Sequence, residues 1–309
     1  MSGAPVTFVG MPRSVRIASV NVNGIRAAAR NGMGAWVDAS GADIITLQEV
    51  RGELEHLEAA LPGWRVIADA SLQKGRAGVA IASREECAIS RVQLGDEALE
   101  SNGRWLEADF EFGSETLTVV SAYVYTGDAD TPAKQDPKWA FLDAMEQRLP
   151  ELSADGGLAL VTGDLNVGHR PLDIRNWKGN VTKAGFLPRE RAYFDRFLTA
   201  EGEPVAGQEG IGRGLGYERS DTRAFSAGRT GLGWVDVGRA SAGEVDGPYT
   251  WWSMRGQAFD NDSGWRIDYH LASPALAPRA SGYRVDRAPS YDTRWSDHAP
   301  VVADYTLGD

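Results

Sequence analysis

The 309-residue sequence predicts an α/β fold in which two mixed β-sheets pack together and helices cover the outside. Short runs rich in Val, Ile and aromatic residues, which are typical of strands, dominate both halves of the chain. Segments with apolar residues at helical spacing lie between these runs, so strands and helices are interleaved. This combination favours a layered sandwich over a simple doubly wound sheet. No short internal repeat is visible.

The first half of the chain is expected to be mainly strands. Six segments have the composition of strands: Val15–Val20, Asp43–Leu47, Trp64–Ala68, Gly78–Ala82, Trp105–Phe112 and Thr116–Val124. Helices are expected between the first of them, at Ala35–Ser40 and Leu54–Leu61. Trp139–Leu149 has apolar residues at helical spacing, and Pro150, which lacks a backbone N–H, is expected to end that helix.

The second half begins with a fully apolar strand at Leu158–Val161 and a helix at Arg189–Leu198. Four strands are expected in the last third: Tyr249–Trp252, Arg266–Ala272, Tyr283–Arg287 and Ala299–Tyr305. The segment between is rich in Gly and Arg, so we expect a long loop at about residues 203–232 and no domain boundary there. The predicted organisation is a tail at residues 1–14 and a single domain at residues 15–309.

Composition narrows the classes of protein that fit the chain. Hydrophobic residues make up 42% and charged residues 24%, as in ordinary globular proteins. The single cysteine, Cys87, excludes an intramolecular disulfide and fits a reducing compartment. No basic segment followed by an apolar one begins the chain, and no apolar stretch approaches the roughly 20 residues that span a bilayer. We therefore expect a soluble cytoplasmic protein without a membrane partner. The net charge of -11 argues against nucleic acid, but it does not describe how Lys and Arg are distributed.

Five distant segments each place a carboxylate, amide or imidazole at the end of an apolar run. They are IASVNVNG with Asn21 and Asn23, IITLQEV with Glu49, LALVTGDLNV with Asp164 and Asn166, GWRIDYHLAS with Asp268, and WSDHAPVVADY with Asp297 and His298. If the strands lie side by side, these ends meet in one oxygen-rich pocket with a single imidazole. Such a pocket suits a hard divalent cation and metal-assisted attack on a phosphoryl group.

Each of these residues also has a structural alternative. Glu49 could pair with an arginine, Asp164 could form an Asx turn, and a lone histidine such as His298 is more often structural than catalytic. Their joint occurrence at five strand ends favours one functional site. Asp297 and His298 are adjacent, so both can reach that site only at a bend. Asp268 is the expected partner that orients the ring of His298 and raises its pKa.

The motifs NVNGIRAA, LQE, GDLNV, DIRNWKGN, RIDY and SDHAP resemble the exonuclease III branch of the endonuclease/exonuclease/phosphatase superfamily, over Arg16 to Tyr305. The resemblance implies a DNase I-like, four-layered α/β sandwich. It implies a divalent-metal-dependent DNA repair nuclease with 3′–5′ exodeoxyribonuclease and abasic-site endonuclease activity, and with 3′-phosphatase activity, in base excision repair. The implied metal is Mg²⁺, with Mn²⁺ as the alternative. The implied partner of a monomeric protein is double-stranded DNA with abasic sites and 3′ ends.

The same resemblance implies a role for each site residue. Glu49 resembles the principal metal ligand, supported by Asn21, Asp297 and Asn23. Asp164 resembles the residue that orients or deprotonates the attacking water, and Asn166 one that holds a phosphate oxygen. The resemblance places His298, paired with Asp268, at the scissile phosphate, and Tyr123 close to that phosphate.

Aromatic residues near the end of the chain point to a substrate with a missing base. Trp251, Trp265 and Ile267 resemble an apolar pocket for an extruded deoxyribose, whereas Trp252 is expected in the core. Further phosphate contacts are expected from Arg104 and Lys178, and from the Gly/Arg-rich loop as a cationic arm along the DNA. The chain departs from many relatives at Tyr125-Thr126, where they carry Pro-Asn. Two alternatives remain: a phosphatase or phosphodiesterase of the same fold that acts on lipid or small-molecule phosphates, and a non-catalytic DNA-binding relative.

Overall fold

The computed structural model describes residues 12–73, 75–95, 97–205 and 228–308. Most of the predicted Gly/Arg-rich loop, and with it the predicted cationic arm, lies outside these residues. The first strand begins at Arg13, two residues before the predicted boundary between tail and domain. No helix in the described part of the chain is long and apolar enough to cross a bilayer.

The described residues form two six-stranded mixed sheets. The first has the order β11 (Ala280–Val285), β12 (Val301–Leu307), β1 (Arg13–Asn21), β2 (Ile44–Gln48), β4 (Val79–Ser83) and β3 (Arg65–Asp69). The second has the order β5 (Ile89–Arg91), β6 (Trp105–Phe112), β7 (Glu115–Tyr123), β8 (Leu158–Asp164), β10 (Asp268–Ala272) and β9 (Val235–Asp236). Each sheet contains one parallel pair, β1 with β2 and β7 with β8, among antiparallel neighbours.

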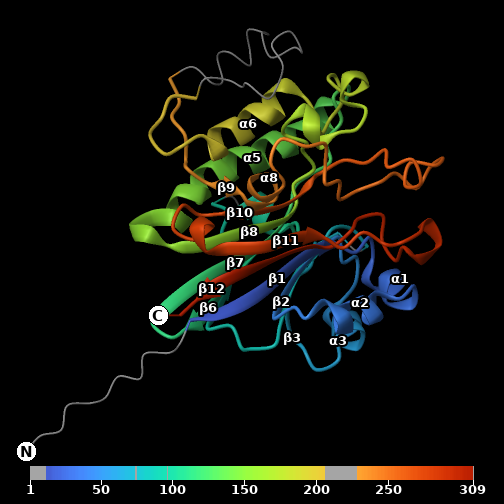
Figure 1. Cartoon of the computed structure of the whole chain (residues 1–309), viewed down its shortest axis with the longest axis vertical. Helices are drawn as coiled ribbons and strands as arrows, with labels where there is room; N and C mark the ends of the chain where they lie inside the picture. Colours follow the sequence, from blue (N-terminus) through green and yellow to red (C-terminus); the bar gives the residue numbers. More distant parts are fainter. Residues whose placement is uncertain (1–11, 74, 96, 206–227, 309) are drawn as a thin grey trace, which may run out of the picture.

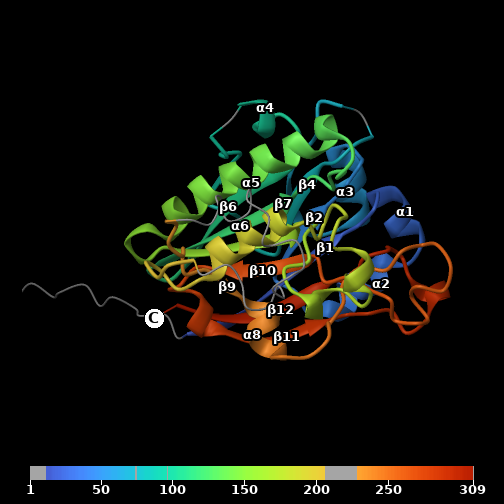
Figure 2. The ribbon, with the colours of Figure 1, turned by 90° about the horizontal axis from the view of Figure 1, so that it is seen from above.

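Helices cover the outer face of each sheet, which gives four layers (Figures 1 and 2). The first sheet is covered by α1 (Ile25–Arg30), α2 (Met33–Ser40) and α3 (Leu54–Ala60). The second is covered by α5 (Pro132–Ser153) and α6 (Pro188–Leu198). Two further short helices lie within the described residues, α4 (Glu97–Glu100) and α8 (Val237–Ala242). The predicted sandwich of two packed sheets with helices outside is confirmed.

Two predicted elements differ from the structure by more than a shift of about three residues at their ends. The helix predicted at Trp139–Leu149 begins at Pro132 and runs past Pro150 to Ser153. A proline at the first helical position costs nothing, and after Pro150 the buried Leu152 holds the last turn against the core. Tyr249–Trp252 forms no strand but only isolated bridges, because its backbone donors go to two separate segments, at Trp265 and Asp297.

The face of each central strand that meets the other sheet changes from apolar to polar along its length. On β8, Leu158 and Leu160 lie in the core between the sheets. Two residues further, the hydroxyl of Thr162 lies 2.6 Å from that of Thr46 on the opposite sheet. Asp164 follows at the end of the strand, on the same face. Strand alternation therefore carries the polar side chains of both sheets to one edge of the sandwich.

A buried ion-pair network supports the start of β10. The guanidinium of Arg266 is buried and pairs with Asp173 at 2.8 Å and with Asp236 at 2.7 Å. Replacing Arg266 with Met would leave two buried carboxylates without this cation, so we expect the free energy of unfolding to fall by about 3–5 kcal/mol in urea denaturation. The control is Arg13→Met, whose ion pair with Glu85 is exposed and should contribute less than about 1 kcal/mol. Equal losses in the two variants would contradict this prediction.

Candidate active site

Strand register brings the predicted residues to the same edge of both sheets. In the second sheet Tyr123 pairs with Asp164, and Asp164 pairs with Asp268 on the other side. In the first sheet Asn21 pairs with Gln48, so Glu49 begins the turn directly after β2. The polar ends of strands from both sheets therefore meet, as the five strand-end segments predict.

A cavity of about 270 Å³ opens at this edge. Its walls are made by Glu49, Tyr123, Thr126, Asp164, Asn166, Ala184, Gly185, Trp251, Trp265, Ile267, Asp297 and His298. Five predicted residues do not line it: Asn21, Asn23, Asp268 and Arg104 form hydrogen bonds to residues that do, and Lys178 is exposed. The bend at residues 295–297 lets the neighbouring Asp297 and His298 face the same cavity, as their adjacency requires.

Two cavity residues adopt backbone conformations that side chains rarely take. Glu49 has a φ of 54° and Asn166 a φ of 50°, both in the left-handed region. Such strain persists only where surrounding structure enforces it, and it concentrates at functional sites. At Glu49 the enforcing contacts are backbone bonds, since its carbonyl accepts from Gly24 at 2.9 Å and the next amide donates to Gly78. The left-handed turn re-aims Glu49 into the cavity, while its neighbour Gln48 stays buried between the sheets.

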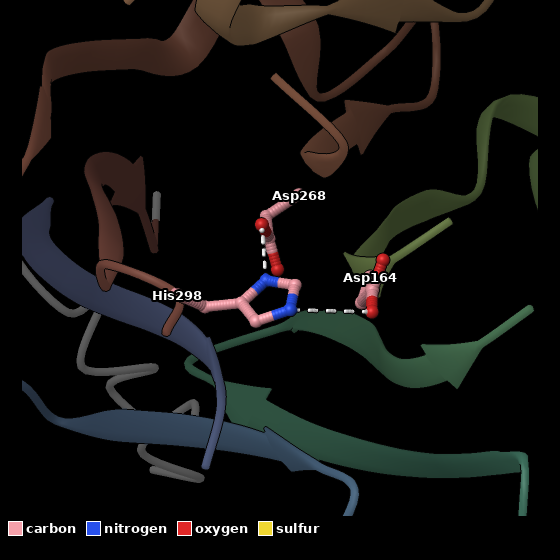
Figure 3. A group of neighbouring side chains, drawn as sticks. All are labelled: Asp164, Asp268 and His298. Carbon is pink, nitrogen blue, oxygen red and sulfur yellow. Dashed lines mark hydrogen bonds and ion pairs between the residues drawn. The ribbon is translucent and has the colours of Figure 1, made fainter. Parts of the chain in front are cut away.

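His298 lies between two buried carboxylates (Figure 3). Its Nδ1 is 2.9 Å from Oδ2 of Asp268, and its Nε2 is 3.7 Å from Oδ2 of Asp164. Burial lowers the pKa of His298, but attraction to Asp268 and Asp164 outweighs it and raises that pKa to about 10. At neutral pH the imidazole is therefore protonated, with its Nε2–H directed toward Asp164 and the cavity.

Asp164 is held by amides on both of its oxygens. Oδ1 accepts from the backbone N–H of Asn166 at 3.0 Å, and Oδ2 from the side-chain amides of Asn21 at 2.9 Å and Asn166 at 3.2 Å. Burial raises the pKa of Asp164 to about 7, although the positive charge of His298 opposes this shift. The raised pKa makes this carboxylate a stronger base than that of an exposed aspartate. Asn21 faces Asp164 with its nitrogen, while its oxygen accepts from the backbone of Asn23.

Two further carboxylates, those of Glu49 and Asp297, line the cavity. Asp297 accepts from the Asn23 amide at 2.9 Å and from the Trp251 indole at 3.0 Å, and both donors are neutral. Glu49 forms an ion pair with the half-exposed Arg51. Because Glu49 and Asp297 line one cavity and both supply carboxylate oxygens, this donor set fits a hard divalent cation.

The remaining wall is apolar. Trp251 and Trp265 meet edge to face with ring centroids 6.1 Å apart, beside the buried Ile267. Gly185 allows this packing, because a Cβ at that position would lie 2.8 Å from the ring of Trp265. Trp252, in contrast, is buried in a core cluster, as the sequence predicts.

The two outlying cations differ in their placement. The guanidinium of Arg104 stacks on the rings of Tyr123 and Tyr125, at 4.5 and 3.8 Å from their centroids, and donates to the carbonyl of Tyr123 at 3.0 Å. It is therefore anchored beside the cavity wall. Lys178 is exposed in the turn Trp177–Gly179, and its ammonium lies 5.6 Å from the ring of Trp177.

Thr250 and Gly185 belong to the site but are not among the predicted site residues. Thr250 is buried and donates to Oδ2 of Asp268 at 2.6 Å, so it fixes the carboxylate that orients His298. A single threonine in a segment predicted to be a strand does not indicate a contact with a residue 18 positions later. Gly185 follows the DIRNWKGN motif, but its role depends on Trp265, which lies 80 residues away in the chain.

Comparison with known proteins adds an independent observation. A profile of the Endonuclease/Exonuclease/phosphatase family matches residues 18–298. The exodeoxyribonuclease of Bacillus subtilis (strain 168) is 29% identical over 289 residues, covering 93% of this chain and 98% of that protein. The DNA repair nuclease APEX1 of Danio rerio is 27% identical over 308 residues, covering 95% and 83%. The structure of an AP endonuclease from Archaeoglobus fulgidus superposes with a TM-score of 0.69 at 27% identity, covering 95% of this chain and 100% of that one.

Proposed function

This chain belongs to the endonuclease/exonuclease/phosphatase family, and from that premise we propose that it is a divalent-metal-dependent DNA repair nuclease. It hydrolyses phosphodiesters of duplex DNA as a 3′–5′ exodeoxyribonuclease and abasic-site endonuclease, and it removes 3′-phosphates, in base excision repair. The observation that carries this proposal is one cavity that joins Glu49, Asp164 and His298 to an apolar wall. The names of the relatives support DNA over lipid or small-molecule phosphates. Residues 15–309 act as one domain in a cytoplasmic monomer.

The metal is Mg²⁺, with Mn²⁺ as the alternative. Glu49 and Asp297 would hold it, with Asn23 and Asn21 orienting Asp297 and Asp164 from behind. Oxygen donors of this kind are those that hard divalent cations prefer. When bound, the ion neutralises charge on the phosphate and on the departing 3′ oxygen.

The residues around Asp164 carry out the proton transfer. Asp164 accepts a proton from the attacking water, for which a pKa near neutrality is suited. Asn166 keeps Asp164 in place through its backbone N–H and binds a phosphate oxygen with its side chain. His298, protonated and oriented by Asp268, stabilises negative charge on the nonbridging oxygens, and Tyr123 lies next to them.

The apolar wall selects the substrate. An abasic sugar has already lost its stacking, so extruding it into the cavity costs less than flipping an intact nucleotide. Trp251, Trp265 and Ile267 would contact the sugar and disfavour a nucleotide that still carries its base. Arg104, anchored on Tyr123, and the exposed Lys178 contact the DNA backbone outside the cavity.

Replacing Trp265 with Ala is expected to reduce this selectivity. We predict that kcat/KM for cleavage at an abasic site falls about tenfold to a hundredfold, because apolar contact with the sugar is lost. Removal of nucleotides from an intact recessed end should change less, so the ratio of abasic-site cleavage to exonuclease activity should fall. The control is Trp36→Ala, since Trp36 is also half-buried but does not line the cavity. A Trp265→Ala variant with an unchanged ratio would contradict the assignment of this wall.

Three duplexes with added Mg²⁺ test the proposed function directly: one internally abasic, one with an intact recessed end and one nicked with a 3′-phosphate. The expected result is cleavage of all three, abolished by a chelator and restored by Mg²⁺. Inositol phosphates serve as the comparison substrate for the alternative phosphatase. Hydrolysis of inositol phosphates without cleavage of any duplex would overturn the proposed function.

A further inference from the structure

A lysine lies fully buried behind the floor of the cavity. Lys138, on α5, has no exposed surface, and its ammonium group has three N–H bonds and three acceptors. These are Oε1 of Glu190 at 2.7 Å, the carbonyl of Asn166 at 2.8 Å and the carbonyl of Thr126 at 3.2 Å. A lysine is almost never fully buried unless its charge is paired and its donors are used. Here both conditions are met.

Glu190 is equally buried and closes the network on the other helix. Its Oε2 accepts from the backbone N–H of Leu187 at 2.8 Å, at the start of α6, and its Oε1 accepts from Gln135 at 3.2 Å. The pair of Lys138 and Glu190 would be enough to join α5 to α6. The contacts with the two carbonyls are not needed to join the helices, because these carbonyls belong to two loops outside both helices.

Both carbonyls belong to residues that line the active-site cavity. Thr126 lies three residues after the end of β7, and Asn166 lies two residues after the end of β8. Asn166 is the residue with a φ of 50° whose backbone and side chain both bond to Asp164. A cation that binds the Asn166 carbonyl therefore stabilises a strained turn on which the position of Asp164 depends.

We propose that Lys138 is a positioning residue for hydrolysis, which holds the Thr126 and Asn166 loops together and so keeps Asn166 aligned with Asp164. The inference rests on the proposed function for its catalytic consequence. Lysine suits this place because three N–H donors on one nitrogen match three acceptors, whereas the guanidinium of arginine is larger and planar. No group on Lys138 touches the cavity itself, so it acts through Asn166 and Thr126.

The same two helices provide a matched control. Glu146 on α5 is buried and pairs with Arg196 on α6 at 2.9 Å, with Arg229 as a further partner. None of these three residues lines the cavity. The test compares Lys138→Met/Glu190→Gln with Arg196→Met/Glu146→Gln, because each double substitution removes an ion pair between α5 and α6 without leaving one buried charge alone.

Activity is measured on an abasic duplex, well below the melting temperature of each variant. For the Lys138 double variant we expect kcat to fall about tenfold to a hundredfold, because misplacement of catalytic groups slows the chemical step. The KM for DNA should change little. The control should lose stability but keep its kcat. In an Asn166→Ala background the Lys138 double substitution should lower kcat by less than about threefold, because the side chain whose alignment Lys138 maintains is already absent. Full additivity, or an equal loss in the control, would overturn the proposal.

Crystal structures of the two double variants keep the test independent of the substrate. We expect Asn166 to leave the left-handed region and its side chain to move away from Asp164 in the Lys138 variant only. An unchanged Asn166 would overturn the positioning role even if the protein cleaves DNA. Failure of the wild-type protein to cleave any duplex, in contrast, would refute the proposed function while this structural comparison still decides the role of Lys138.

Discussion

The Asp164→Asn variant is expected to hydrolyse an abasic duplex about 10³–10⁴ times more slowly than the wild-type protein, because it removes the group that accepts the proton of the attacking water. Asparagine has the same size, but its amide cannot take up a proton. It also places an NH₂ group where the carboxylate now accepts from Asn21 and Asn166. The cavity keeps its shape and loses a negative charge, so binding of DNA should be retained.

Single-turnover cleavage and binding of the same duplex in chelator separate these two effects. The control is Asp143→Asn, whose carboxylate accepts from the hydroxyl of Tyr193 on the outer helices and does not line the cavity. Asp143→Asn should cleave at the wild-type rate. Cleavage by Asp164→Asn within tenfold of the wild type would remove Asp164 from the role of general base.

The second large effect is expected for Glu49→Gln. This change keeps the shape of the side chain but removes the charge that would attract a divalent cation, so the affinity for Mn²⁺ should fall by about a hundredfold or more. The rate at low Mg²⁺ should fall with it and recover in part at high Mg²⁺. Calorimetric titration with Mn²⁺ measures the affinity without any need for turnover.

Glu53→Gln is the matched control for this experiment. Glu53 lies four residues further along the chain, at the start of α3, where its side chain accepts from the helix backbone. It does not line the cavity, so its replacement should leave Mn²⁺ affinity unchanged. Wild-type affinity in Glu49→Gln would show that the cation binds elsewhere.

Much of the fold could be predicted because its strands carry their signal locally. Val, Ile and aromatic runs mark β1, β6 and β8 whatever they pack against, and the polar residues that end β1 and β8 mark the edge where the site forms. The alternation Leu158, Leu160, Thr162, Asp164 also contains the change from apolar to polar between the sheets. That pattern is readable in the sequence once both faces of the strand are followed separately.

The parts that could not be predicted depend on contacts between distant segments. Lys138 stands in PKWAFLDAM and reads as a surface lysine, since its burial depends on Glu190 and on two loop carbonyls. Thr250 matters only because β10 brings Asp268 next to it. The long extent of α5 has the same cause, because Leu152 is buried by tertiary packing that follows Pro150. Local propensity contains none of these contacts.

The most direct test of a shared cation and phosphate site is a crystal soaked in Mn²⁺ and examined by anomalous scattering. We predict a single strong peak in the cavity, in contact with the carboxylates of Glu49 and Asp297 and absent from crystals of Glu49→Gln. Asp164 and His298 should face the same space. A peak bound elsewhere on the molecule, or a cavity in which no ion is detected at saturating Mn²⁺, would contradict the assignment.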